Sequence, residues 1–418
     1  MNYSKCRWLV IMLIFKIGFV AVHAQTAWPS KTWANATNLS AVLPTSVVEM
    51  SGLYWNNELK RLLTVGDAGY FTALQYNSTT KQFTLLGSVK NSDGPEGITQ
   101  VNTSGNEFYT IDENSYEIRK YTFNTGFTSV TKLKSWNLLI SPSPMTNTDN
   151  TGPEGIVFVP DSYLQKTAFV SSVSGQVYTS TKGMGGLLFL AHQNGGYVWV
   201  YDVNPNVSND FLFVGKYKTN RSESCDLAFD NSTGLMYILH NIDDNHLEVT
   251  DLKSSLYFGE YKFNLVNEYL IPNPSGTANV EGFTLSPKYP QENTLGAWLC
   301  RDITKSSEVA DALRWFTPFA ADGTNLQTGI LQLQANTNQN FRLFNKNNSI
   351  ILEEQNSSNN CYDIYIYNLQ GSVISTIKNV NLAYHFNINH FNPGVYLVKI
   401  ADKNRQSALL KFIKNPDF

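Results

Sequence analysis

The sequence predicts an all-β protein: a β-propeller of five, possibly six, blades followed by a small C-terminal antiparallel β-sandwich. A short phrase containing Gly and Glu recurs five times between residues 49 and 315, and strand-like runs follow each copy. Charged residues make up only 16% of the 418 residues, against about 25% in an average soluble protein. Aromatic residues reach 13% and the net charge is −3, so a nucleic-acid partner is not expected.

The N-terminus has the pattern of a secretory signal peptide. A basic start precedes an apolar run, and small residues stand at the cleavage position before Gln25. We therefore assign residues 1–24 to the signal peptide. A membrane anchor is the alternative, but Lys16 interrupts the run and about 20 apolar residues are needed to span a bilayer. No later segment is long and apolar enough, so the mature chain is expected to have no transmembrane anchor.

The cysteines of the mature chain indicate no disulfide framework. Cys225, Cys300 and Cys361 lie far apart and lack the spacing of zinc ligands. A Cys225–Cys300 bond is one alternative, and buried free thiols are the simpler expectation. The fold is then stabilised by its core, with or without a metal.

The repeated phrase predicts the blades, within residues 25–316. Successive copies lie about 45 to 70 residues apart, the spacing of propeller blades, and Gly-marked turns separate the strand-like runs. Five copies predict five blades, although the long stretch Asp161–Gly186 is either an insertion or a concealed sixth blade. Residues 28–48 are expected to supply a strand that closes the ring. Two unrelated β-sandwiches are the alternative architecture.

Glutamates recur in the phrase at two alternating columns. One column contains Glu49 and Glu223, and the column two residues later contains Glu96, Glu154 and Glu281. Where one column has Glu, the other has a small residue or Asn. Because positions two apart on a strand share a face, each blade is expected to direct one glutamate into the central channel.

Carboxylates that converge in this way need compensation. Neighbours about 6 Å apart repel by roughly 3 kcal/mol at an effective dielectric near 20. Either their pKa values rise, or a cation binds between them. Oxygen ligands without His favour Ca²⁺, with Mg²⁺ or Mn²⁺ as the next choice. The alternative is that Gly-Pro-Glu-Gly merely forms a tight turn between blades.

Further polar residues stand at the end of the second strand of each blade. In a propeller this end lies at the same rim as the start of the first strand. His and Arg beside a metal serve in acid–base chemistry or phosphate binding, so His192, His240 and Arg301 are catalytic candidates. Candidate substrate-binding residues are Asp67, Asp112, Glu113 and Asp302. The simpler alternative is that these are loop residues that make turns. No nucleophile elbow or phosphate-cradling Gly loop occurs in the sequence.

The blade openings resemble those of a known propeller group. Glu49–Leu53, Asp93–Ile98 and Gly152–Pro160 are similar to the SdiA-regulated and phytase-like ("esterase-like") propellers, over roughly residues 45–315. The resemblance implies a calcium-associated propeller and, for some relatives, phosphoesterase activity. Three glutamates match the acidic motif position directly and two match through the offset column, while the active-site signature of alkaline phytases is not evident.

The tail forms a separate module. Residues 317–340 are rich in Asn, Gln, Thr and Gly and read as a linker, and residues 341–418 contain short strand-like runs typical of a small sandwich. Ile366–Gly371, Asn392–Ile400 and Lys411–Lys414 resemble the type A C-terminal sorting domain of the Bacteroidetes type IX secretion system. The resemblance implies the type IX machinery as a partner and a secreted or outer-surface location. An ordinary binding sandwich is the alternative.

These observations favour a secreted calcium-binding propeller that hydrolyses a phosphoester or related ester at its acidic mouth. A non-catalytic binding or adhesion propeller with a structural calcium is the second possibility. The third is a gluconolactonase-like enzyme, whose site usually mixes Asn and Asp ligands. A funnel of His and Arg over the metal is expected of the enzyme, and a mouth covered by Asp161–Gly186 is expected of the structural ion. The fold alone does not decide.

Overall fold

The chain divides into two compact units, residues 1–322 and 323–418. The computed structural model describes, in the first unit, residues 26–47, 49–91, 94–242, 244–272, 274, 279–289, 294–303 and 310–320. In the second unit it describes residues 341–346, 349–354, 361–368, 373–381, 384–388, 391, 394–401 and 407–414. The predicted signal peptide, residues 1–24, and residues 321–340 of the predicted linker lie outside the described residues.

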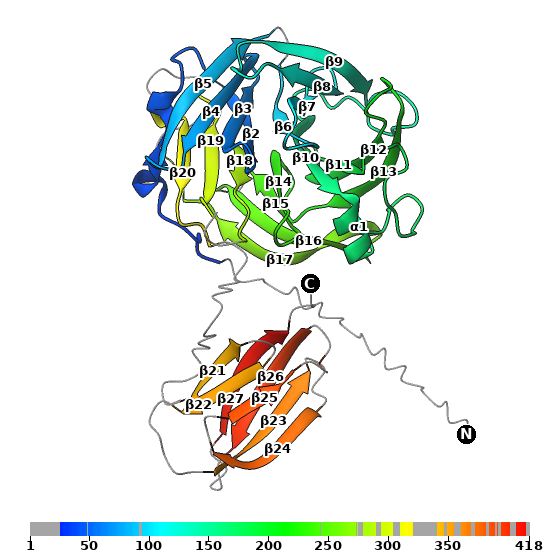
Figure 1. Ribbon diagram of the computed structural model, residues 1–418. Helices are drawn as coiled ribbons and strands as arrows, with labels where there is room; N and C mark the ends of the chain where they lie inside the picture. The colour runs from blue at the N-terminus through cyan, green and yellow to red at the C-terminus, as the bar shows by residue number, and fades with distance from the viewer. Residues whose placement is uncertain are drawn as a thin grey trace, which may run out of the picture. The chain divides into compact units, whose positions relative to one another are not determined.

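The first unit is a five-bladed β-propeller of antiparallel four-stranded blades (Figure 1). The first two blades contain β2 (Met50–Asn56), β3 (Arg61–Gly66), β4 (Tyr70–Asn77) and β5 (Gln82–Lys90), then β6 (Gly97–Thr99), β7 (Glu107–Asp112), β8 (Glu117–Phe123) and β9 (Val130–Asn137). The next two contain β10 (Pro153–Pro160), β11 (Gly186–His192), β12 (Tyr197–Val203) and β13 (Phe211–Lys218), then β14 (Asp226–Asp230), β15 (Leu235–His240), β16 (His246–Tyr257) and β17 (Glu260–Leu270). A parallel pair at Lys218 and Lys262 joins these two blades into one eight-stranded sheet.

The fifth blade is completed by the N-terminal segment, which closes the ring. It contains β18 (Val280–Leu285), β19 (Ala297–Arg301) and β20 (Leu313–Phe316), and β1 (Thr37–Asn38) pairs with β20 as its outermost strand. The short 3₁₀ helices η1 (Trp33–Asn35) and η2 (Ser40–Val42) flank β1. The expectation that residues 28–48 close the ring is therefore confirmed. Residues 161–186 form no sixth blade; they begin with α1 (Asp161–Thr167) and return as a loop to β11.

Apolar and aromatic side chains fill the space between neighbouring blades. Trp55 of the first blade stacks on Trp298 of the fifth, with ring centroids 4.7 Å apart. Phe319, which lies inside the predicted linker, is buried against Trp28. The first residues of that segment therefore pack on the propeller. Because both faces of each blade are covered, charged residues have few places in the propeller, which accounts for their low proportion.

The second unit is a small sandwich of two antiparallel sheets, as the sequence predicts. One sheet contains β21 (Phe341–Lys346), β22 (Ser349–Glu354) and β25 (Tyr384–Asn387); the other contains β23 (Cys361–Asn368), β24 (Val373–Asn381), β26 (Gly394–Ala401) and β27 (Ser407–Lys414). Leu343, Ile364 and Val398, from both sheets, are buried in its core.

The sequence predicts free thiols and no membrane-spanning helix in the mature chain. Cys225, Cys300 and Cys361 are free cysteines, the first two of them buried, so the Cys225–Cys300 bond does not form. In the part of the chain that the structure describes, no helix combines the length and the apolar character that a membrane crossing requires.

Candidate acidic site at the mouth of the central channel

The five inner strands, β2, β6, β10, β14 and β18, lie nearest the centre of the propeller (Figure 1). Each pairs antiparallel with the second strand of its blade, so the start of one meets the end of the other. Pro153 pairs with His192 and Val280 pairs with Arg301. The expected common rim is therefore present, and it carries both sets of polar residues that the sequence singles out.

The acidic residue of the phrase lies in a bulged part of the inner strand. The register shifts between Pro153 and Ile156 in β10 and between Val280 and Gly282 in β18, and these intervals contain Glu154 and Glu281. A bulge places two residues opposite one and turns a side chain in a new direction. In the third blade the phrase is thus strand from Pro153 onward, so a tight turn between blades does not account for it.

The glycine after the glutamate is required because the inner strands approach one another closely. A Cβ atom on Gly97 would lie 2.7 Å from both the carbonyl oxygen of Glu154 and the nitrogen of Ile156. Atoms of the neighbouring backbone cannot give way as a flexible side chain can. The Gly-Pro-Glu-Gly phrase therefore combines a carboxylate for the channel with the smallest residue for strand contact.

We expect Gly97→Ala to lower the free energy of unfolding by about 1–3 kcal/mol, because the methyl group forces two inner strands apart. Gly126→Ala is the matched control, since the nearest atom to its Cβ would be a Thr128 methyl carbon at 3.8 Å. Urea denaturation followed by tryptophan fluorescence measures both. Equal effects of the two substitutions would contradict the close-approach explanation.

Three glutamates from three blades face one another at the mouth. Glu96, Glu154 and Glu281 are only 6–7% exposed. Burial, and then the charges of the neighbouring carboxylates, raise the pKa of Glu96 and of Glu154 well above the usual value. Burial also raises the pKa of Glu281 to about 7. Each of these carboxyl groups therefore resists ionisation while the others are charged.

A second ring of polar residues surrounds this cluster, one from each blade at the position after the second strand: Asp67, Glu113, Gln193, Asn241 and Asp302. Glu113 accepts a hydrogen bond from the Gly152 nitrogen at 2.8 Å, and burial raises its pKa. The Asn241 amide donates to both oxygens of Glu281, at 3.0 and 3.1 Å. Sequence reasoning missed Asn241 and Gln193 because it weighted the adjacent histidines, although the strand-end alignment contains them.

The mouth contains oxygen atoms that lack partners among the described residues. Oδ1 of Asn241 and Oδ1 of Asp302 are both buried without a hydrogen-bond partner. Burial, followed by the charges of Glu49 and Asp67, raises the pKa of Asp302. Among the residues that the structure describes, no Lys or Arg forms an ion pair with the carboxylates of either ring. Protons or a cation must therefore offset this charge.

The structure brings together three of the five predicted metal ligands on the inner strands. Glu49 and Glu223 precede the strands, since β2 begins at Met50 and β14 at Asp226, and the equivalent strand positions hold Ser51 and Cys225. Ser51 hydrogen-bonds Glu96. Glu49 contributes only its charge at Asp302, and Glu223 accepts a bond from His240 through its backbone carbonyl. The inner strands therefore do not each carry one glutamate. Glu49 and Glu223 stand two residues before the strand position that Glu96, Glu154 and Glu281 occupy.

Among the described residues, the side chains of the three catalytic candidates contact residues outside the two polar rings. His192 packs against Trp199, and burial, with the charge of Lys216, lowers its pKa to about 4. His240 contacts Glu248 at 3.2 Å. Arg301 is fully buried, pairs with Asp311 at 3.2 Å and lies over the Trp33 ring. The enzymatic interpretation expects a funnel of His and Arg side chains over the acidic cluster. These contacts do not form such a funnel.

The four candidate substrate-binding residues separate in the same way. Asp67, Glu113 and Asp302 belong to the second ring, whereas Asp112 forms a buried ion pair with Arg119. The reason is strand alternation: Asp112 and Glu113 are consecutive, so their side chains leave the strand end in opposite directions.

Asp226 links three inner strands beside the acidic cluster. It stands where the other four phrases have Gly, and it is 1% exposed. Its carboxylate accepts hydrogen bonds from the nitrogens of Leu227 and Phe283, both at 2.8 Å, and from the backbone of Leu53. It thus joins the edges of β2, β14 and β18 across the channel. In the sequence, this residue is marked by the departure from the Gly found at the same position in the other four phrases.

The donor set at the mouth is all oxygen, which suits a hard cation such as Ca²⁺. Within the described residues, however, no three His, Cys, Asp or Glu side chains are already placed to hold one ion. A bound cation therefore requires the glutamate side chains to rotate toward it. The loop from α1 does not cover the mouth, because it leaves β10 at Pro160, the end of that strand opposite to Glu154.

Comparison with known families identifies the C-terminal unit. Residues 325–415 match the family model described as "Secretion system C-terminal sorting domain". The chain therefore carries a type IX sorting domain, is handled by the type IX secretion machinery, and is secreted to the cell surface or beyond. No curated protein matches the chain.

Solved structures resemble the two units only distantly. A DUF3244 family protein with an immunoglobulin-like β-sandwich fold, from Bacteroides vulgatus, shares 18% identity over 18% of this chain and 85% of its own, with a TM-score of 0.17. The nidogen/laminin complex shares 12% identity over 81% of this chain and 82% of that one, with a TM-score of 0.32. Sqt1 from Saccharomyces cerevisiae shares 10% identity over 87% and 83%, with a TM-score of 0.31.

Proposed function

We propose that this exported propeller binds a divalent cation, calcium in preference to magnesium, at the acidic mouth, and that it belongs with the SdiA-regulated and phytase-like propellers it resembles. One observation carries the proposal: three glutamates more than nine-tenths buried, from three blades, face one another without a Lys or Arg partner among the described residues. Carboxylates buried in this way are stable only when protonated or bound to a cation.

The residues that would hold the ion are Glu96, Glu154 and Glu281. Asp302 and Asn241 each offer a buried oxygen atom that lacks a hydrogen bond, so they are suited to complete the oxygen set. Calcium accepts six to eight such ligands in flexible arrangements, whereas magnesium demands near-octahedral geometry. The two rings combine Glu, Asp, Asn and Gln side chains in an irregular arrangement, which suits calcium better than magnesium.

Binding is the activity that this geometry supports best, with the calcium-loaded mouth as the ligand-binding face. Hydrolysis of a phosphoester is the second candidate, and the Glu113–Glu154 contact favours it. These two carboxyls interact by a hydrogen bond and both have raised pKa values, which suits a proton donor beside a metal-activated water. The candidates His192, His240 and Arg301 have no part in either proposal.

We expect calcium to raise the melting temperature of the full-length mature protein over that measured in chelator. A free calcium concentration one hundred times the dissociation constant stabilises the folded state by about 2.7 kcal/mol. Glu96→Gln combined with Glu154→Gln should abolish the difference and, in chelator, melt higher than the wild type, because the mutual repulsion is gone. Differential scanning fluorimetry measures both effects.

Glu223→Gln is the matched control, because Glu223 precedes β14 and is not among the ligands of this proposal. This variant should keep the full calcium effect. A melting temperature that does not respond to calcium, in protein shown by elemental analysis to carry no ion, would end the cation proposal. Phosphate release from a phosphomonoester, assayed in the same calcium and chelator samples, separates the binding protein from the hydrolase, and Glu113→Gln should abolish any release.

A further inference from the structure

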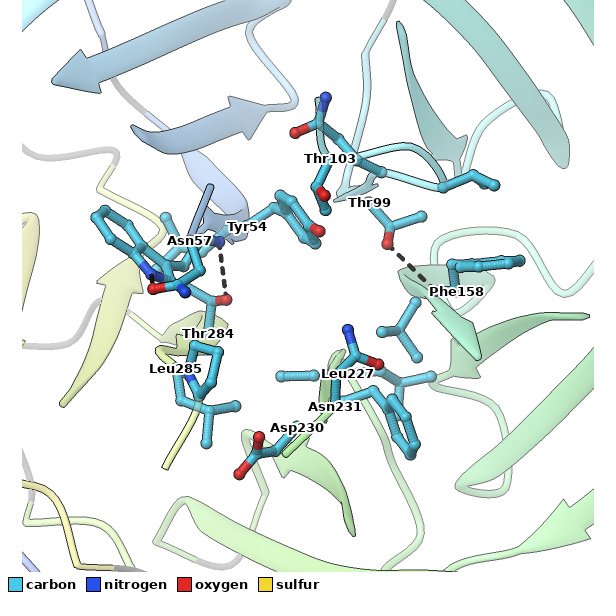
Figure 2. Close-up of a pocket in the computed structure, with 18 of the residues that line it drawn as sticks. Tyr54, Asn57, Thr99, Thr103, Phe158, Leu227, Asp230, Asn231, Thr284 and Leu285 are labelled. Carbon is cyan, nitrogen blue, oxygen red and sulfur yellow. Dashed lines mark hydrogen bonds between the residues drawn. The ribbon is translucent and has the colours of Figure 1, made fainter. Parts of the chain in front are cut away.

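A second cavity opens at the other end of the channel, on the far side of Asp226 from the acidic mouth. It has a volume of about 450 Å³, and the later residues of all five inner strands line it (Figure 2). Leu53 and Leu227, whose backbone groups bind Asp226, lie at its inner end. None of the described residues that line the cavity belongs to the two polar rings of the acidic mouth. Its volume falls in the range of about 300–1,000 Å³ that is typical of small-molecule sites.

The lining combines aromatic faces with neutral polar groups. Tyr54, Phe158 and Phe229 are all half-buried, so part of each ring is available to a ligand. The Tyr54 hydroxyl points into the pocket in Figure 2. Burial raises the pKa of Tyr54 above its usual value, so the hydroxyl stays protonated and can donate a hydrogen bond. An exposed amide, Asn231, lies across the pocket from it.

The charge of the lining excludes one large class of ligand. No Lys or Arg is among the described residues that line the pocket, although the chain has 31 of them. The two acidic residues present, Glu58 and Asp230, already accept hydrogen bonds from Thr103 and from Ser232. A phosphate, sulfate or carboxylate ligand would find no counter-charge here. A neutral ligand with an apolar face and several hydroxyl groups matches what is offered.

The walls are held in place by their own hydrogen bonds. Thr99 Oγ1 accepts from the Phe158 nitrogen at 3.2 Å, and Thr284 Oγ1 accepts from the Trp55 nitrogen at 3.0 Å (Figure 2). Both bonds join neighbouring inner strands across the gap between blades. The aromatic residues of the lining are thus carried on fixed backbone, which reduces the cost of ordering them when a ligand binds.

The insertion peculiar to the third blade supports this pocket. Tyr163 of α1 packs edge-on against Phe229, with ring centroids 5.1 Å apart, and its hydroxyl donates to the backbone carbonyl of Asn231. The one blade with extra chain therefore uses it to position two lining residues of the next blade. This buttress is the feature that distinguishes the pocket from an incidental gap at the end of a channel.

We propose that this pocket binds a neutral carbohydrate unit, with a sugar face on the Phe158 ring and hydroxyl groups bonded to Tyr54 and Asn231. Sugar rings have apolar C–H faces that stack on aromatic side chains, and their hydroxyls suit amide and phenol partners. The proposal does not depend on calcium at the acidic mouth. It makes the protein a two-ended propeller, with a cation site at one end and a carbohydrate site at the other.

The test uses the full-length mature protein and five neutral trisaccharides: maltotriose, cellotriose, xylotriose, mannotriose and chitotriose. Ligand-observed NMR detects binding, and isothermal titration calorimetry measures the dissociation constant. At least one trisaccharide should bind, and Phe158→Ala should weaken it at least tenfold. Tyr54→Phe and Asn231→Ala, which remove one hydroxyl and one exposed amide, should each weaken it several-fold while leaving the melting temperature unchanged.

Controls separate this site from the other mouth. Glu96→Gln and added chelator should leave carbohydrate affinity unchanged, and a trigalacturonate should not bind. Absence of binding by all five trisaccharides would overturn the proposal. So would binding that survives all three substitutions in the pocket, or equally tight binding of the acidic sugar.

Discussion

Asp226→Ala is expected to lower the free energy of unfolding of the propeller by at least about 3 kcal/mol. The substitution removes a carboxylate that accepts backbone N–H groups of Leu53, Leu227 and Phe283. Each buried donor left without a partner costs about 1–3 kcal/mol. The three donors belong to β2, β14 and β18, so the loss falls on the contacts that hold these inner strands together.

Urea denaturation of the wild type and the variant measures this effect. Asp226→Asn is the matched control, because it keeps the volume of the side chain but replaces one accepting oxygen with a donor. The Asn variant should therefore lie between the wild type and Asp226→Ala. A loss below 1 kcal/mol for the alanine variant would show that water replaces the carboxylate, and that these bonds contribute little to holding the inner strands together.

In chelator, the propeller should become more stable as the pH falls from about 8 to 6.5. Glu96, Glu154, Glu113 and Glu281 have pKa values above their usual value when folded, so in this range the folded state binds more protons than the unfolded state. Stability therefore falls as pH rises. The stabilisation is complete below the unfolded pKa of about 4.5 and is lost as pH passes through about 7 for Glu281. At about 1.4 kcal/mol for each unit, ionising Glu281 costs the folded protein roughly 3 kcal/mol.

Between pH 6.5 and 8, the glutamates contribute more than the histidines to the pH dependence of stability. His192 acts in the opposite direction, because its folded pKa of about 4 lies below the usual 6.5, so the unfolded state binds more protons at this residue as the pH falls toward 6.5 and below. Between pH 6.5 and 8 its contribution is small. Chemical denaturation over this range should give a clear slope for the wild type and a smaller slope for the Glu96→Gln, Glu154→Gln, Glu281→Gln variant, which keeps Glu113.

Calcium provides the complementary measurement. If the cation replaces the protons, saturating calcium should flatten the wild-type slope and leave the triple variant unchanged. A slope that is identical in the wild type and the triple variant would show that the carboxyl cluster does not titrate in this range. In that case, Glu281 would not have the raised pKa of about 7 on which this prediction rests.

The sequence alone determined the broad architecture. Five copies of one phrase predict five blades, and the polar ends of the second strands predict the rim on which the acidic residues lie. Both predictions depend on strand periodicity and antiparallel pairing, which are local properties. The sorting domain was equally accessible, because its signature is contained in short contiguous motifs near the end of the chain.

Only the tertiary structure decided which neighbours in the sequence reach the mouth. Asp112 and Glu113, His240 and Asn241, and Arg301 and Asp302 are adjacent pairs. In each pair the second residue joins the acidic mouth, while the side chain of the first pairs with a residue outside it: Arg119, Glu248 and Asp311 respectively. A bulge or strand end fixes this choice, and neither is visible in composition.

Contacts between segments far apart in the sequence determined the role of Asp226 and the formation of the second pocket. Asp226 acquires its role from Phe283 and Leu53, which lie on other blades, and the second pocket is assembled from the ends of all five inner strands. The sequence determines what each strand carries, because side-chain alternation is local. Where two carboxylates meet, and which backbone groups they satisfy, depends on the closed ring, since only closure brings β18 beside β2.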